Sequence, residues 1–310
     1  MRWRWAHRII RRPQNHRLLT MKNVILALIT LLFAIDAGAV DKYPVNGMVL
    51  KVDLAGKTMV VSCKEIPNYM EAMTMPFSVR DAKLLDGLTP GATIDFTLVV
   101  EKDDSYVEGI HVRGYESTEQ EPLQARRLKI LEGLGDSKPS AKVLTTGQVV
   151  PNFTLTDQRR QQISLHQFSG KVVALNFVYT RCPLPQYCFR ISNNFGRLQK
   201  RFKPRLGDDL ILLTVTFDPV HDTPEVLSEY AQTWKADPNT WHFLTGTQDD
   251  VNRLTEIFGV GFWQDEAALT HSLHTAVIDR QGKLVANLEG NQFSPEQLGD
   301  LVQTVLDKSK

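Results

Sequence analysis

The chain has 310 residues, and its 36 Lys and Arg against 35 Asp and Glu give a formal net charge of +1. Seven of these bases and one of these acids lie in residues 1–39, which leaves 29 bases and 34 acids in the remainder. This mildly acidic remainder has no basic patch, so nucleic acid is not an expected partner, and three cysteines are too few for a disulfide scaffold.

Residues 1–39 are typical of an export signal. Met21 and Lys22 precede the apolar run NVILALITLLFAI, and residues 37–39 (AGA) form a small-residue cleavage pattern. The run is shorter than the ~20 apolar residues of a membrane span, and Asp36 also counts against an uncleaved anchor. We expect the true start at Met21 and a mature protein that is periplasmic, with membrane anchoring on the extracytoplasmic side as the alternative.

Residues 40–115 predict a small all-β domain. The runs VNGMVLKVD, KTMVVS, ATIDFTLVVE and SYVEGIHVRGY are rich in β-branched residues and are separated by Gly, Asp and Pro turn signals. Several short strands in one small domain are typical of an OB-like barrel. Residues 116–142 follow as a charged linker that contains a helical pattern, EPLQARRLKILEGL, and then GDSKPSAK.

Residues 143–310 alternate predicted strands and helices. KVVALNFVYT and DLILLTVTFD have the continuous apolar character of strands buried on both faces. Asp222 is expected to cap a helix that begins with Pro224, and TAVIDRQGKLVANLEG predicts an antiparallel hairpin before a final helix. This order predicts an α/β thioredoxin-like sandwich, and the whole chain is therefore expected to form two domains.

The segment RCPLPQYC holds two of the three cysteines, Cys182 and Cys188. A structural disulfide across so short a loop would remove little chain entropy. Cys188 is expected at the N-terminus of the next helix, where the helix dipole lowers a thiol pKa. These arguments favour a redox pair or a metal site over a structural bridge.

Two histidines favour the metal over the redox pair. A thioredoxin-type oxidoreductase has a proline before the strand that faces its cysteines, but here LTHSLHTAVID carries His271 and His274 instead. Two thiolates and one imidazole form a soft ligand set suited to Cu(I). His271 is the expected ligand; His274 is the competing one, because in an extended chain residues three apart point to opposite faces.

The segments VYTRCPLPQYC, TVTFDPVHDTP and HSLHTAVIDRQG resemble the Sco/SenC family of copper metallochaperones. The resemblance implies that Cys182, Cys188 and His271 bind copper and that Asp218 lies near the site, either behind the ligands or facing a partner. Two features depart from the family pattern. Five residues separate the cysteines instead of three, and Phe189 stands where a proline usually follows.

A second group of soft donors lies in the first domain, where CKEIPNYMEAMTMPF contains Met70, Met73 and Met75. In a strand, Met73 and Met75 would project to the same face and form a thioether pair that favours Cu(I). The alternative is that these methionines only fill the core of the barrel, as methionine does well.

The AMTMPF stretch and the following LLDGLTPGATIDFTLVVEKDDSYVEGI resemble the CusF-type copper-binding domain. That family implies Met73 and Met75 as ligands together with a histidine, whose position is held here by Cys63. The aromatic position of the family aligns with Met70, beside Tyr69, so Met70 is either a fourth ligand or part of the core.

Together these features predict an exported chaperone that binds Cu(I), with Cu(II) as the alternative, and delivers it to a copper enzyme. The Sco/SenC resemblance implies that the recipient is an apo copper protein such as the CuA subunit of cytochrome c oxidase. One alternative is a thiol:disulfide oxidoreductase that reduces a periplasmic target and has a thioredoxin-like reductant as its partner. Another is a copper buffer or sensor. Copper delivery requires no bond chemistry, so no enzymatic activity is assigned.

Overall fold

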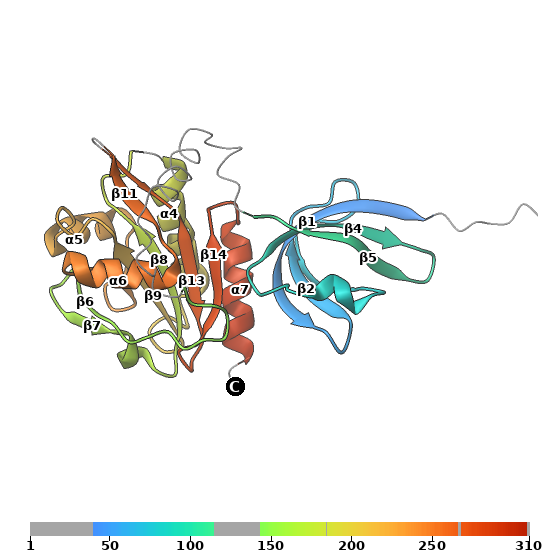
Figure 1. Ribbon diagram of the computed structural model, residues 1–310, viewed down its shortest axis with the longest axis horizontal. Coiled ribbons are helices and arrows are strands. Elements are labelled where there is room, and N and C mark those ends of the chain that lie inside the picture. The colour runs from blue at the N-terminus through green and yellow to red at the C-terminus, as the bar shows by residue number, and fades with distance from the viewer. Residues whose placement is uncertain (1–39, 115–142, 184, 266–267, 309–310) are drawn as a thin grey trace, which may run out of the picture.

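The computed structural model describes residues 40–114, 143–183, 185–265 and 268–308 (Figure 1). The predicted signal segment 1–39 and the predicted linker 116–142 lie outside this description. Within it, every helix is too short or too polar to cross a membrane. The described chain forms an N-terminal sheet and a C-terminal α/β unit, as the sequence predicted.

The N-terminal domain is a five-stranded antiparallel sheet with the order β3-β2-β1-β4-β5. Its strands are β1 (Asp41–Asp53), β2 (Thr58–Cys63), β3 (Thr74–Ser78), β4 (Thr93–Val100) and β5 (Ser105–Val112), with a short 3-10 turn η1 (Ala82–Leu85). The edge strands approach each other at a parallel bridge between Val79 and Val107, so the sheet curls around its core. Phe77 and Phe96 meet inside this core at 4.9 Å between ring centroids.

The C-terminal domain is built on a seven-stranded sheet with the order β14-β13-β8-β9-β10-β6-β7. Its strands are β6 (Thr154–Asp157), β7 (Gln162–Ser164), β8 (Val172–Val178), β9 (Leu210–Thr216), β10 (Trp241–Thr245), β13 (His274–Ile278) and β14 (Leu284–Glu289). Strands β8, β9 and β10 are parallel, and every residue of β8 and β9 is buried. This accounts for their continuous apolar sequences, because helices cover both faces.

Helices cover the two faces of this sheet unequally. Side chains of α4, α5 and α7 form one buried cluster with the sheet, and side chains of α6 belong to a second cluster on the other face. The helices and helical turns of this domain are η2 (Leu165–Phe168), η3 (Pro185–Phe189), α4 (Arg190–Arg201), α5 (Pro224–Thr233), α6 (Gln248–Phe258) and α7 (Pro295–Lys308). A separate two-stranded hairpin consists of β11 (Phe262–Asp265) and β12 (Ala268–His271). The predicted thioredoxin-like sandwich is thus confirmed.

One predicted helix cap is wrong by a residue. The N-cap of α5 is Thr223, whose hydroxyl accepts a hydrogen bond from the amide of Val226 at 3.5 Å. Asp222, the expected cap, is fully buried and turns toward β8 and β9 instead. A threonine hydroxyl is a normal N-cap, so the adjacent carboxylate is available for another contact.

The two domains are packed against each other, with α7 lying between β14 and the N-terminal sheet (Figure 1). Met48 and Leu50 of β1 are buried in the same cluster as Leu301 and Val302 of α7. Gly91 approaches β14 so closely that a Cβ there would lie 2.5 Å from the Leu288 side chain. The first domain is therefore held on the second by a buried apolar contact.

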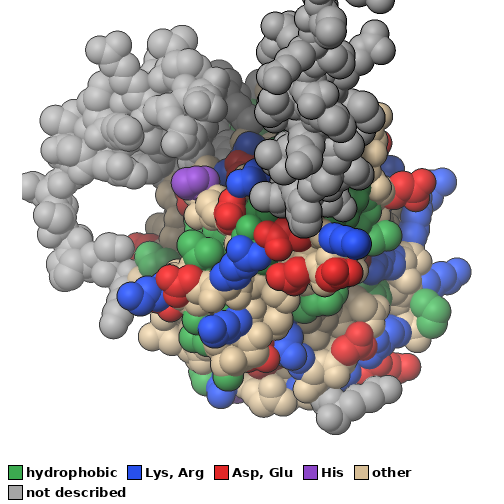
Figure 2. Space-filling view, turned by 90° about the vertical axis from the view of Figure 1, so that its right-hand side faces the viewer, with side chains coloured by type: hydrophobic (Ala, Val, Ile, Leu, Met, Phe, Trp, Pro, Cys, Tyr) green, Lys and Arg blue, Asp and Glu red, His purple; other side chains and the backbone are tan. Residues whose placement is uncertain are grey.

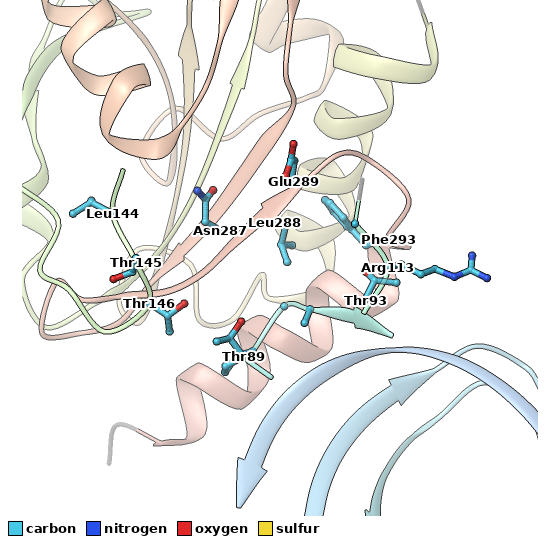
Figure 3. A pocket seen from close by; sticks show the side chains of 14 residues that line it. Thr89, Thr93, Arg113, Leu144, Thr145, Thr146, Asn287, Leu288, Glu289 and Phe293 are labelled. Carbon is cyan, nitrogen blue, oxygen red and sulfur yellow. The ribbon is translucent and has the colours of Figure 1, made fainter. Parts of the chain in front are cut away.

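A cavity of about 520 Å³ lies beside this contact (Figure 3). The turn before β4 contributes Thr89, β4 begins with the lining residue Thr93, and β14 contributes Asn287 and Glu289. Its described lining contains no cysteine, methionine or histidine, so it is separate from the soft-metal donors. On the face in Figure 2, acidic and basic side chains alternate without a large patch of either sign.

Candidate metal centres

The cysteine loop connects the end of β8 to the beginning of α4. Cys182 is half-buried, and Cys188 is only 1% exposed. Both are reduced, and their thiols are hydrogen bonded to each other. The fold therefore brings together two sulfur atoms that are six residues apart in the sequence.

The pKa of Cys188 was expected to be low, but it is raised well above the ordinary thiol value. The hydrogen bond with the Cys182 thiol is the largest cause, and burial is the second. Both effects favour the neutral thiol over the thiolate, and together they exceed the stabilisation expected from the start of a helix. In the metal-free chain Cys188 is thus a buried neutral thiol beside the half-buried Cys182.

A carboxylate that the sequence analysis assigned to a helix cap holds the start of this loop. Asp222 accepts hydrogen bonds from the Thr180 hydroxyl at 2.5 Å, the Thr180 amide at 3.1 Å and the Thr216 hydroxyl at 2.5 Å. Burial raises the pKa of Asp222. Thr180 precedes Cys182 by two residues, so this contact fixes where the loop leaves β8. The sequence did contain a sign of this role for Asp222: the adjacent Thr223 can cap the helix equally well, which leaves the carboxylate available for the loop.

Asp218 lies close to the same loop, as the Sco/SenC resemblance implied. Its side chain is 11% exposed and forms an ion pair with Arg181, 2.8 Å between Oδ2 and Nε. Arg181 directly precedes Cys182, and the Asp218 amide donates to the Thr216 hydroxyl at 3.0 Å. The position of Asp218 behind the loop is compatible with a supporting role, which stays a prediction.

Aromatic side chains of α5 and its C-terminal end border the second cysteine. Tyr230 contacts the Ser192 hydroxyl at 3.0 Å between oxygens. Burial, with a smaller contribution from the nearby Cys188, raises the pKa of Tyr230 to about 12. Phe189, which directly follows Cys188, is largely exposed and meets the Trp234 ring edge-on at 4.7 Å.

The predicted histidine ligand lies on the strand hairpin next to this loop. His271 ends β12 and pairs with Phe262 of β11. Strand β13 begins three residues later at His274, and its Thr275 pairs with Asn176 near the end of β8. The backbone therefore brings the His271 segment toward the end of β8 from which the cysteine loop departs. The His271 side chain is outside the described part of the chain, so its ligand role stays a prediction.

His274, the competing ligand, is buried in β13. Its Nδ1 atom lies 3.2 Å from Oδ1 of Asn287 on β14, and the Asn287 amide donates to the Phe258 carbonyl at 2.8 Å. This environment favours a structural histidine. The described side chains do not include the ring of His271. Among them, no three His, Cys, Asp or Glu side chains lie close enough together to hold a metal ion.

The second group of soft donors lies on strands β2 and β3. The Cys63 amide donates to the Met73 carbonyl at 2.9 Å, and Val61 pairs with Met75. Directly opposed residues of an antiparallel pair share a face, as do alternate residues of one strand. The register therefore places Cys63, Met73 and Met75 on the same face of the sheet.

These three donors differ in exposure. Cys63 is 3% exposed, Met75 is half-buried and Met73 is 47% exposed. Burial raises the pKa of Cys63 to about 12, so its neutral thiol is the resting form. One buried thiol and two thioethers, one of them open to solvent, are a donor set that suits Cu(I) and rejects hard cations.

Met70 and Tyr69 lie in a tight turn beside these strands. Ile66 and Met70 exchange backbone hydrogen bonds of 2.8 and 3.0 Å, and Met70 packs against the domain core. Tyr69 stacks on Tyr43 of β1 with ring centroids 4.0 Å apart. Tyr69 of this turn thus forms an aromatic pair with β1, although the position that resembles the family's aromatic residue is Met70.

Comparison with known proteins gives two family matches. The model of the SCO1/SenC family matches residues 141–307, and that of the copper binding periplasmic protein CusF matches residues 42–112. A putative copper-binding protein of Stutzerimonas stutzeri is 27% identical over 169 residues, which cover 53% of this chain and 78% of that protein. A SCO1 protein homolog of Bacillus subtilis is 29% identical over 150 residues, covering 47% and 76%.

Among solved structures, a SCO1/SenC family lipoprotein of Bacillus anthracis is similar with a TM-score of 0.46 and 24% identity. The match covers 53% of this chain and 97% of that chain. Taken together, the family matches confirm the two resemblances seen in the sequence and copper as the expected metal.

Proposed function

The chain belongs to the SCO1/SenC family, and on that premise we propose that it is an exported copper chaperone that delivers Cu(I) to a copper protein. The observation that carries the proposal is the hydrogen-bonded thiol pair of Cys182 and Cys188 at the start of α4. Two adjacent sulfur donors, one buried and one half-buried, can bind a soft monovalent ion.

In this proposal Cys182, Cys188 and His271 bind the copper cargo. Each thiol must lose its proton when the metal enters, so uptake releases protons. Asp222 holds the loop through Thr180, and Asp218 holds it through Arg181. The chain thus positions donors and does not catalyse a bond rearrangement, which agrees with a carrier.

The N-terminal domain would be a second Cu(I) site, with Cys63, Met73 and Met75 as donors and Met70 as a further candidate. The exposed Met73 gives incoming copper a donor at the surface, whereas Cys63 holds it from inside. Copper would then reach the cysteine loop by successive ligand exchange. The predicted export signal, together with a domain that matches a periplasmic protein, supports a periplasmic location.

The recipient we propose is an apo copper protein, with the CuA subunit of cytochrome c oxidase as the first candidate. This recipient follows from the Sco/SenC resemblance and not from a surface of the molecule. A thioredoxin-like reductant would be the partner that returns an oxidised Cys182–Cys188 pair to the dithiol.

A second function is favoured by the same thiol pair. Two reduced, hydrogen-bonded cysteines can also exchange with a disulfide of a periplasmic target. The raised pKa of Cys188 counts against it, because the thiolate is the attacking form. A copper buffer without a recipient is the remaining alternative.

Copper counted per reduced chain tests the proposal. We expect two Cu(I) ions for the wild type. One ion should remain in His271→Ala and one in the double variant Met73→Ala, Met75→Ala. The control for the first is His221→Ala, an exposed histidine outside the site, and the control for the second is Met59→Leu, a buried core methionine opposite Phe77.

Redox activity separates the two functions. If His271→Ala binds copper like the wild type, the chaperone ligand set is wrong. If that variant loses copper but keeps full dithiol activity, and a host grown without copper still requires the protein, the oxidoreductase is the correct function.

A further inference from the structure

The outer face of β2 and β3 carries two hydroxyl groups directly behind the proposed sulfur donors. Ser62 and Thr74 are paired in the register of these strands. Because successive strand residues point to opposite faces, both hydroxyls point away from the face of Cys63, Met73 and Met75. Each hydroxyl residue is the immediate chain neighbour of a proposed ligand.

One carboxylate of the other domain accepts hydrogen bonds from both hydroxyls. Oδ2 of Asp300 on α7 lies 2.7 Å from the Ser62 hydroxyl and 2.8 Å from the Thr74 hydroxyl. The Gln297 side chain, one turn earlier on α7, donates to the Ser62 carbonyl at 3.1 Å. The two ligand-bearing strands are therefore joined through a single helix that is more than 200 residues away in sequence.

Asp300 is itself held in place. Its other carboxylate oxygen accepts from the Arg201 guanidinium at 2.7 Å. Ser62 is almost completely buried, and the apolar contact of Met48 and Leu50 with α7 flanks this polar group. Hydrogen bonds to a charged, fixed acceptor are stronger than ordinary ones. The Ser62 bond is part-buried in the interface, whereas the Thr74 and Arg201 bonds lie at its exposed edge.

We infer that Asp300 is a positioning residue for the copper site of the N-terminal domain, which is thus completed across the domain interface. This inference rests on the proposed Cu(I) role of Cys63, Met73 and Met75. By fixing Ser62 and Thr74, Asp300 sets the spacing of β2 and β3 at the level of the donors. Partners that orient metal ligands from behind commonly change affinity tenfold to a hundredfold when they are removed.

The effect should be confined to the first domain. Arg201, the other contact of Asp300, is the last residue of α4, whereas Cys188 lies in η3, two residues before the opposite end of that helix. Loss of Asp300 therefore changes β2 and β3 directly but leaves the cysteine loop with its own contacts to Asp222 and Asn291.

The test uses the full chain with Cys182→Ser and Cys188→Ser, so that only the N-terminal site binds copper. In this background we expect Asp300→Ala to weaken Cu(I) binding about tenfold in competition with a chromogenic Cu(I) chelator. Ser62→Ala with Thr74→Val should give a similar loss, and all three changes together should cost little more than either set alone. Asp307→Ala on the same helix is the matched control, because Asp307 pairs with Arg205 and Gln303 of its own domain.

A companion chain with Cys63→Ala, Met73→Ala and Met75→Ala reports on the second site. There Asp300→Ala should leave Cu(I) affinity within twofold. Equal losses at both sites, or a loss of less than twofold at the N-terminal site, would overturn the inference. If the background chain without the cysteine pair binds no Cu(I) at all, the proposed N-terminal copper site fails first, and the inference fails with it.

Discussion

Removal of the Asp222 carboxylate should damage the cysteine loop from behind. Asp222 is fully buried and joins three donors, the Thr180 amide, the Thr180 hydroxyl and the Thr216 hydroxyl. In Asp222→Ala the two hydroxyls can rotate toward other acceptors, but the part-buried amide of Thr180 cannot. Thr180, two residues before Cys182, then loses its carboxylate link to Thr216 at the end of β9.

The magnitude follows from these contacts. Hydrogen bonds to a charged acceptor contribute about 1.5–3 kcal/mol each, and a buried donor left without a partner costs about 1–3 kcal/mol. The cost of burying the carboxylate, visible in its raised pKa, offsets part of this gain. We expect Asp222→Ala to lower the free energy of unfolding by about 3 kcal/mol. Asp222→Asn keeps the shape and one good acceptor and should cost about 1 kcal/mol.

Urea unfolding of the reduced, metal-free chain measures the first effect, and chelator competition measures Cu(I) affinity at the cysteine pair, which we expect to fall about tenfold. Glu225→Gln at the start of α5 is the control, because its ion pair with the exposed Arg160 lies on the open surface and contributes little to stability. Two results for Asp222→Ala would refute the positioning role of Asp222. One is a decrease in the free energy of unfolding below about 1 kcal/mol, and the other is the expected decrease of about 3 kcal/mol with unchanged Cu(I) affinity.

Two further predictions concern stability. Leu50→Ala removes a buried side chain from the cluster shared with α7 and should cost about 2–4 kcal/mol in urea unfolding, whereas Leu54→Ala, exposed at the end of β1, should change little. Burial lowers the pKa of His242 below its ordinary value of 6.5, although Asp157 opposes this. The unfolded chain then binds a proton first on acidification, so this stability is present above pH 6.5 and is lost below it at up to about 1.4 kcal/mol per pH unit. His242→Gln should lack this component of the slope; an unchanged slope would contradict the assignment.

Much of the fold followed from local sequence patterns. The continuous apolar run at β8 predicts a strand that is buried on both faces. The alternating runs of the first domain predict strands that are buried on one face only. The common face of Met73 and Met75 also followed from strand geometry, and the register of β2 and β3 adds Cys63 to it. These properties depend on neighbours within a few residues or on a single strand pair.

Properties set by tertiary contacts did not follow. The low pKa expected for Cys188 came from its helix position, but burial and the Cys182 thiol act in the opposite direction and dominate. Asp222 resembled a helix cap, and only the adjacency of β8 and β9 reveals it as a support of the loop. The contact between Asp300 and Ser62 joins positions in different domains, and no local pattern marks it.

The unusual length of the cysteine loop has a structural explanation in the turn that precedes α4. Residues Pro185–Phe189 form a π-helical turn, which closes hydrogen bonds over one residue more than an α-helical turn and is common at functional sites. The wider turn takes up part of the longer spacing and still delivers Cys188 to the buried position beside Cys182. Asn291 donates to the Gln186 carbonyl within this turn, and Phe189 rests on Trp234 just after Cys188. Because the turn is held at both points, five intervening residues can present the same pair of sulfur atoms as a shorter loop.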